Sequence, residues 1–169
     1  MKDSLLRAKL ITGTMYSEEG KYERAVKGLK AEFGAIEAKS EVFSFDFTDY
    51  YAREIGPGLK KRFLCFREPV KRNKLRNIKA FTRALKAWLS LKGKRRVNID
   101  PEYVTKNNLG LASTKERGHR IYLGKGVYAG VVLIFRKHRF IYMPWTYADY
   151  KTNLARDFFL GVRNSLQIG

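Results

Sequence analysis

A short polar segment in the second half of the chain places three different functional groups at every second residue. In the order Arg96-Val97-Asn98-Ile99-Asp100, strand alternation puts Arg96, Asn98 and Asp100 on one face and the apolar residues on the other. A guanidinium fork, an amide and a carboxylate suit a phosphate or sugar ligand, and a divalent cation could bind beside Asp100. An internal Arg96–Asp100 pair that braces the sheet explains the same residues, so both interpretations stay open.

A second polar segment, residues 114–123, contains Lys115, His119 and Arg120. His119 is one of two histidines, and it is the candidate general base outside the carboxylates because His138 sits in a basic turn. Lys115 and Arg120 are candidate phosphate ligands. The alternative for His119 is a structural hydrogen bond at the start of a strand.

A third segment, residues 45–56, combines carboxylates with aromatic rings. Asp46 ends a predicted strand, from which it could hold a divalent cation, and Asp46 or Glu54 could move a proton. A turn in which Asp46 caps the following backbone is the alternative. The Tyr50 and Tyr51 rings lie beside these groups, where they could stack on a base or simply line the rim of a sheet.

The residue types favour neither a zinc site nor a P-loop. One cysteine, Cys65, and two separated histidines cannot supply the usual zinc ligand sets, so we predict no metal centre of that kind. The cofactor is therefore unknown, apart from the divalent cation considered at Asp46 or Asp100. The chain also has no Gly-x-x-x-x-Gly-Lys-[Ser/Thr] segment, so a P-loop mechanism is not predicted.

The net charge is the strongest global property, because 35 Lys and Arg residues against 16 Asp and Glu residues give +19. A field of this sign attracts phosphate-bearing partners, and rings such as Tyr150 among basic residues suit stacking on nucleobases. The ion-pair networks of a heat-adapted protein would need acids in similar number, so pairing alone does not explain the excess. Basic side chains scattered over solvated faces would give the same total.

The length of 169 residues predicts a single globular domain over residues 1–169. A hydrophobic fraction of 44% excludes a disordered chain. The longest nearly apolar stretch, Val127–Phe135, is too short to cross a bilayer as a helix, and Met1–Ser4 leads into no apolar signal core. We therefore predict a cytoplasmic protein with no membrane partner.

Hydrophobic periodicity predicts the elements that position these groups. Alternation predicts strands at residues 9–16, 41–47, 60–66, 95–100, 109–114, 119–123, 127–135 and 140–143. Helical spacing predicts helices over Tyr22–Phe33, over residues 73–92 with an almost purely basic outer face and a stop at Gly93, and over Leu154–Val162. This order predicts an α+β fold in which a single, mostly antiparallel sheet is packed by about three helices.

Several of these segments jointly resemble an uncharacterised prokaryotic family, the domain of unknown function 4416. The motifs that carry the resemblance lie at residues 9–13, 45–51, 96–101, 119–123 and 145–150. The matched polar positions are Asp46, Thr48, Tyr50, Tyr51, Glu54, Arg96, Asn98, Asp100, Lys115, His119, Arg120, Asp149 and Tyr150. The resemblance implies little about function, and a GTP-binding label sometimes attached to the family finds no P-loop here.

The chain also departs from the pattern that the resemblance leads us to expect. Glu102 stands where the pattern has glycine, Gly130 and Val132 replace residues of an Ala-Glu-Val-Thr-Leu segment, and Ala148 replaces a proline. If the family used the acid at position 130, this member would lack that group.

Three functions fit the sequence. The leading hypothesis is a basic protein that binds nucleic acid, RNA in particular, because aromatic rings beside basic residues suit unpaired bases. The second is an enzyme that acts on a nucleotide or another phosphorylated metabolite, with phosphate held by Arg96, Lys115 and Arg120. The third is an accessory protein that docks on an acidic protein partner. The sequence does not predict the oligomeric state.

Overall fold

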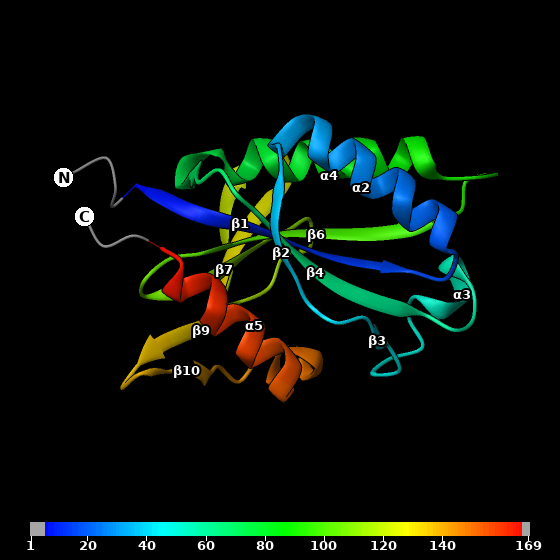
Figure 1. The fold of residues 1–169 in the computed structure, drawn as a ribbon. Coiled ribbons are helices and arrows are strands. Elements are labelled where there is room, and N and C mark those ends of the chain that lie inside the picture. The colour runs from blue at the N-terminus through cyan, green and yellow to red at the C-terminus, as the bar shows by residue number, and fades with distance from the viewer. Residues whose placement is uncertain (1–5, 167–169) are drawn as a thin grey trace.

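One antiparallel sheet forms the middle layer of the protein, and helices lie on both of its faces (Figure 1). The structure is a computed structural model that describes residues 6–166. The strand order is β10-β9-β7-β6-β1-β4-β2, and β3, β5 and β8 pair with β4, β1 and β9 respectively. The strands are β1 (Arg7–Tyr16), β2 (Ile36–Lys39), β3 (Phe43–Ser44), β4 (Lys60–Phe66), β5 (Val70–Lys71), β6 (Val97–Val104), β7 (Asn108–Ser113), β8 (Ile121–Gly124), β9 (Val127–Arg136) and β10 (Arg139–Tyr142).

Two long helices cover one face of the sheet and a third covers the other face (Figure 1). The long helices are α2 (Glu19–Phe33), α4 (Leu75–Leu89) and α5 (Asn153–Asn164), and the short ones are α3 (Ala52–Ile55), η1 (Arg72–Lys74) and η2 (Ala148–Lys151). The predicted α+β class, with a mostly antiparallel sheet and about three main helices, is confirmed.

Helix α4 forms because its apolar residues recur at helical spacing. Leu75, Ile78, Leu85 and Leu89 are buried along one stripe, and three of them join the core between the sheet and α2. The helix ends at Leu89 because the backbone of the next residue is extended, with a ψ of 150°. The end predicted at Gly93 was therefore wrong by one turn.

A second core lies on the opposite face, under α5. Ile11 of β1, Phe63 of β4 and Leu133 of β9 are fully buried there against Phe159 of the helix. The hydroxyl of Thr152 accepts a hydrogen bond from the backbone N–H of Ala155 and caps the helix. The sheet is thus covered on both faces, and polar side chains that point into either core need partners.

The alternating segment at residues 41–47 was predicted as one strand, and this was wrong. Only Phe43–Ser44 is a strand, and the side chain of Phe47 is 41% exposed, so the alternation does not bury the third phenylalanine. The sheet instead uses Ile36–Lys39, which pairs with β4 and which the sequence interpretation missed.

Strand β6 differs from the predicted range 95–100, because it begins at Val97 and continues through Pro101 to Val104. Pro101 pairs with Thr12 of β1, whereas β7 pairs with β6 only from Glu102 onward. The proline therefore lies just before the segment that is paired on both sides, in keeping with the preference of proline for strand positions free of a second partner.

Within residues 6–166, none of the helices is both long enough and apolar enough to cross a membrane. The segment Met1–Ser4, in which we saw no signal core, lies outside the described residues.

Candidate functional site

The two central strands β6 and β7 diverge, and this divergence opens a hollow in the sheet. β6 pairs with β1 along its whole length, from Val97 to Val104. It pairs with β7 only through Glu102–Val104, opposite Leu109–Leu111. Beyond Leu111, β7 continues to pair with β9 but has left β6. The first half of β6 therefore has an open side.

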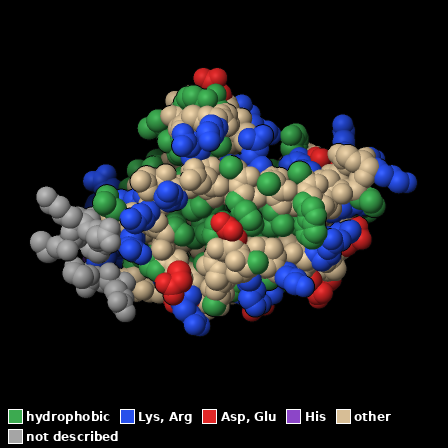
Figure 2. All heavy atoms as spheres, turned by 90° about the horizontal axis from the view of Figure 1, so that it is seen from above, with side chains coloured by type: hydrophobic (Ala, Val, Ile, Leu, Met, Phe, Trp, Pro, Cys, Tyr) green, Lys and Arg blue, Asp and Glu red, His purple; other side chains and the backbone are tan. Residues whose placement is uncertain are grey.

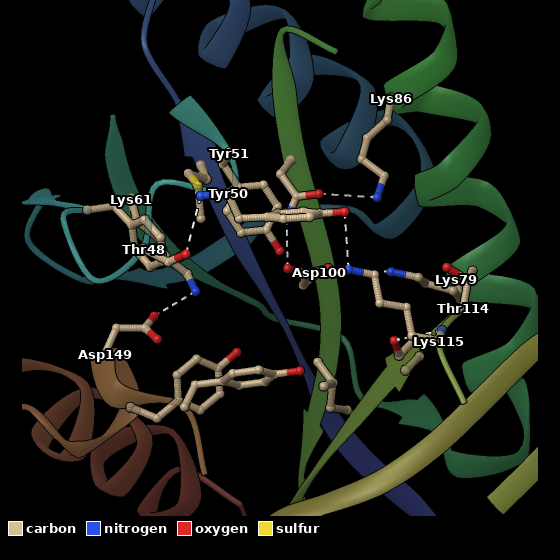
Figure 3. Close-up of a pocket in the computed structure, with 18 of the residues that line it drawn as sticks. Thr48, Tyr50, Tyr51, Lys61, Lys79, Lys86, Asp100, Thr114, Lys115 and Asp149 are labelled. Carbon is tan, nitrogen blue, oxygen red and sulfur yellow. Dashed lines mark hydrogen bonds and ion pairs between the residues drawn. The ribbon is translucent and has the colours of Figure 1, made fainter. Parts of the chain in front are cut away.

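A pocket of about 310 Å³ occupies this opening (Figure 3). Its cationic lining residues are Lys61, Lys79, Lys86, Arg95, Lys115, Arg117 and Arg120. Among the described residues, the carboxylates in its lining are Asp100 and Asp149. The lining is completed by Asn98, by the hydroxyl side chains Thr48, Ser113 and Thr114, by the rings of Phe45, Tyr50, Tyr51, Tyr147 and Tyr150, and by Met15, Leu111 and Ala112. The pocket thus carries a large excess of positive charge.

Two of these cations come from helix α4, and their side chains reach the pocket beside the unpaired half of β6. Lys79, Thr82 and Lys86 are buried along one stripe of the helix, and Lys79 and Lys86 line the pocket (Figure 3). The outer face of this helix was expected to be almost purely basic. Two of its lysines instead point inward, because the gap between β6 and β7 leaves room for long polar side chains.

A hydrogen-bonded chain fixes the polar groups of β6. The Asn98 amide nitrogen donates to Asp100 Oδ2 at 2.8 Å, and Lys79 Nζ donates to Asp100 Oδ1 at 3.4 Å. Arg95 Nη1 donates to Asn98 Oδ1 at 3.1 Å. Burial opposes ionisation of Asp100, but the ammonium groups of Lys79, Lys86 and Lys61 outweigh it and lower the pKa of this carboxyl.

The hydrogen bonds of Asp100 occupy the carboxylate at which a divalent cation was considered. Both oxygens of its carboxylate already accept hydrogen bonds, one from Lys79 and one from Asn98. Among residues 6–166, no three His, Cys, Asp or Glu side chains gather in a way that could hold a metal ion.

Lys61 forms the opposite side of the pocket with Asp149 (Figure 3). Its Nζ lies 2.7 Å from Asp149 Oδ2, and the rings of Phe63, Tyr150 and Phe45 surround the ammonium at 5.0 to 5.4 Å. Burial acts against the charge of Lys61, but Asp149 and the neighbouring acids outweigh it and raise the pKa of the lysine.

Gly13 makes room for this lysine. A Cβ atom at residue 13 would lie 3.0 Å from Cε of Lys61, which crosses β1 at this point. A side chain there would require the Lys61 side chain, which is paired with Asp149, to shift by a few tenths of an ångström.

Glu102 of β6 is a buried carboxyl outside the pocket lining. The residue is fully buried, and neither carboxyl oxygen has a hydrogen-bond partner within the described chain. Burial raises the pKa of Glu102 well above its ordinary value, although Lys61 acts in the opposite direction. Burial therefore favours the neutral form of this carboxyl, which weakens its ability to offset the cations of the pocket.

The rim of the pocket is built from tyrosines and basic residues. Lys115 Nζ lies 3.2 Å from the Tyr50 hydroxyl and 4.3 Å from the centre of its ring. The hydrogen bond from Lys115 lowers the pKa of Tyr50. Arg120 Nη2 donates to the Tyr147 hydroxyl at 2.9 Å, and Nη1 donates to Ser113 Oγ at 2.8 Å. These contacts link the segment after β7 to Tyr50 and Tyr147 in the lining of the pocket.

Most of the residues predicted to bind a ligand lie in this pocket. The structure brings together Asn98, Asp100, Lys115, Arg120, Tyr50, Tyr51 and Tyr150. Arg96 is separated from them, because it precedes β6 and its Nη1 lies 3.5 Å from Glu18 Oε1. Arg95 occupies the position beside Asn98 that we expected for Arg96.

The three residues predicted to move protons lie outside the pocket lining. His119 stacks on Trp145 with ring centres 4.5 Å apart, and burial with nearby arginines lowers its pKa. Glu54 binds Arg95 Nη2 at 2.5 Å, which lowers the pKa of its carboxyl. Asp46 is exposed. Glu54 therefore positions a lining residue, and the geometry gives His119 and Asp46 no contact with the pocket.

Gly130, where the sequence departs from the family pattern, lies against the side chain of Arg120. A Cβ atom at this position in β9 would lie 3.2 Å from Cγ of Arg120. A larger side chain there would require Arg120 to move from Ser113 and Tyr147.

Sequence reasoning missed four of the cations that line the pocket. Lys61, Lys79, Lys86 and Arg95 were not singled out, and Asp149 was only a matched position. One signal was present for α4: the polar residues Lys79, Thr82 and Lys86 share a stripe next to the apolar stripe. Lys61 also alternates with inward-facing Phe63 and Cys65.

The fold and the site together define an α+β protein whose sheet divides around a cationic pocket. The chain belongs to the family described as Domain of unknown function (DUF4416), whose model matches residues 6–166. The family resemblance seen in the residues is therefore confirmed. No curated protein and no solved structure matches the chain.

Proposed function

We propose that the protein binds a small phosphorylated molecule in the pocket between β6 and β7. The observation that carries this proposal is the charge of the lining, in which seven Lys and Arg side chains face two carboxylates. Lys61, Lys79 and Arg95 pair with carboxylates, whereas no carboxylate within residues 6–166 forms an ion pair with Lys115, Arg117 or Arg120. A phosphate group would supply the counter-charge that these three cations lack.

The size of the pocket favours a metabolite or nucleotide over an extended polymer. A volume of about 310 Å³ lies at the lower end of the range for small-molecule sites. The rings of Tyr50 and Tyr147 at the rim suit contact with a planar or sugar group next to the phosphate. On the face covered by α2 and α4, Lys and Arg side chains are dispersed among hydrophobic and uncharged atoms (Figure 2). This dispersal does not favour a continuous track for RNA on that face.

RNA binding was our leading hypothesis from sequence. Within this proposal, RNA is one of the molecules that could supply the phosphate group. A terminal phosphate of a single strand could enter the pocket as a free nucleotide would. A cytoplasmic location is part of the proposal, because phosphorylated metabolites are abundant there.

Isothermal titration calorimetry of the full chain tests the proposal with four ligands: inorganic phosphate, a nucleoside monophosphate, a sugar phosphate and a 12-nucleotide single-stranded RNA. We expect the small phosphates to bind, with affinity that falls as salt rises. The Lys115→Met variant should weaken them about tenfold, because a hydrogen bond between an ammonium and a phosphate contributes about 1.5 to 3 kcal/mol. Lys30→Met, which removes an exposed lysine of α2, is the matched control.

The opposite pattern would contradict the proposal. Tight RNA binding that Lys115→Met leaves unchanged, together with no binding of the small phosphates, would place the polyanion on the outer surface.

A further inference from the structure

Three buried lysines line the pocket, and one of them is unlike the other two. Lys61 has Asp149 at 2.7 Å and Lys79 has Asp100 at 3.4 Å. Lys86 Nζ instead lies 3.4 Å from the amide oxygen of Asn98, a neutral acceptor, and its side chain has no carboxylate partner within residues 6–166. The residue is only 9% exposed.

The charges around Lys86 are mostly of its own sign. Its own helix contributes Lys79 and Arg83, and the segment before β6 contributes Arg95. The carboxylates that act on Lys86 are Asp100 of β6 and Glu54 of α3. Burial, reinforced by the ammonium of Lys79, lowers the pKa of Lys86 to about 8. Roughly one molecule in ten then carries the neutral amine at pH 7, against fewer than about one in a thousand for an ordinary lysine.

A neutral amine inside a pocket for phosphate has a specific chemical use. We propose that Lys86 forms an imine with the carbonyl carbon of a phosphorylated aldehyde or ketone. This inference rests on the proposed function, since the other cations of the lining hold the phosphate. Lysines that form imines are activated by desolvation and by a neighbouring cation, and Lys86 has both.

The step balances without any further reactant. The lone pair of the Lys86 nitrogen attacks the carbonyl carbon, and the electron pair of the C=O bond moves to oxygen. One amine proton moves to that oxygen, giving a carbinolamine. The second amine proton and the hydroxyl group then leave as water while the C=N bond forms. The Asn98 amide oxygen accepts an N–H of Lys86 and so orients the nitrogen within the pocket.

Reductive trapping tests the inference on the full chain. The protein is incubated with pyridoxal 5′-phosphate, used as a phosphorylated aldehyde probe, and is then reduced with borohydride and mapped by peptide mass spectrometry. We expect the label to concentrate at Lys86, with a rate that rises through pH about 8. Inorganic phosphate should slow labelling, and unphosphorylated pyridoxal should label Lys86 at least about tenfold more slowly.

The variants Lys86→Arg and Lys30→Arg, together with calorimetry of phosphate binding, distinguish failure of the imine from failure of the phosphate site. Lys86→Arg keeps the charge but should abolish the specific label, whereas Lys30→Arg should leave it unchanged. Label spread evenly over exposed lysines, or label that survives in Lys86→Arg, would overturn the inference. Phosphate binding by calorimetry without labelling of Lys86 would remove the imine and leave the proposed function standing. Equal labelling by both aldehydes with no phosphate binding would overturn the phosphate site and, with it, the inference that the carbonyl compound is phosphorylated.

Discussion

The ammonium nitrogen of Lys61 lies 2.7 Å from a carboxylate oxygen of Asp149, although 88 positions separate the two residues in the chain. Their side chains are 6% and 5% exposed, so both charges are withdrawn from water. The pair joins strand β4 to the η2 turn that leads into α5, and it forms one side of the pocket. Buried pairs of this kind contribute to geometry more dependably than to stability.

The first prediction concerns this pair. Lys61→Met and Asp149→Asn should each destabilise the protein by about 3 to 5 kcal/mol, because each leaves a buried charge without its partner. The double variant should lose clearly less than the sum of the two. Urea unfolding of the four proteins measures the coupling free energy, and strict additivity of the two losses would show that the ion pair does not form.

The second prediction concerns the space beneath Lys61. Gly13→Ala should destabilise by about 1 to 3 kcal/mol, because the new Cβ lies 3.0 Å from Cε of the lysine. Gly161→Ala in α5 meets nothing within 4 Å and should instead stabilise by about 0.5 to 1 kcal/mol through helix propensity. Thermal unfolding of both variants checks the sign, and an equal shift of both would contradict the close approach at Gly13.

The third prediction concerns the pH dependence of stability at Lys86. A pKa lowered from 10.5 to about 8 means that the folded chain releases this proton before the unfolded chain does. Below pH 8 the buried charge costs the wild type up to about 3 kcal/mol, and this cost disappears as pH rises toward 10.5. Lys86→Met should therefore be the more stable protein at pH 7, with a margin that shrinks between pH 8 and 10.5. Denaturant unfolding across this range measures the margin, and a constant difference would show that Lys86 titrates normally.

The fourth prediction concerns Glu102, whose pKa is raised. Below pH 4.5, the ordinary value of its carboxyl, folded and unfolded chains both hold the proton. As pH rises further, the unfolded chain releases the proton while the folded chain keeps it, so the wild type loses stability. Glu102→Gln does not titrate and should gain on the wild type as pH increases above 4.5. Urea unfolding at several pH values tests this, and a margin that is independent of pH would mean that Glu102 is ionised in the fold.

The sequence predicted some elements well because their signals are local. The strand over residues 60–66 agrees with β4, since a run of inward-facing apolar residues is sufficient to define it. The segment 41–47 failed although its alternation was the cleanest, because the partner strand β4 pairs with only two of its residues. Pairing in a sheet depends on segments distant in the chain, which periodicity does not report.

The residues of the candidate site also fall into those that local spacing predicts and those that depend on the fold. Alternation placed Asn98 and Asp100 correctly on one face of β6, because their spacing is a property of the strand itself. His119 was expected to act as a base from its type alone, yet the fold stacks it on Trp145, outside the pocket lining. Lys79 and Lys86 belong to a helix that was expected to have an almost purely basic outer face, but the position of α4 against the sheet buries both of them in the pocket lining.

By itself, the amino-acid sequence determined the α+β class, the family, the positive charge and the polar face of one strand, because composition and short-range spacing are sufficient for each. Only the tertiary structure decided that β7 leaves β6 after Leu111 and that lysines from β4 and α4 converge in the resulting gap. The physical reason is that burial and electrostatic neighbourhood belong to a position in space. A lysine acquires an unusual pKa only when packing removes its water and chooses its neighbours.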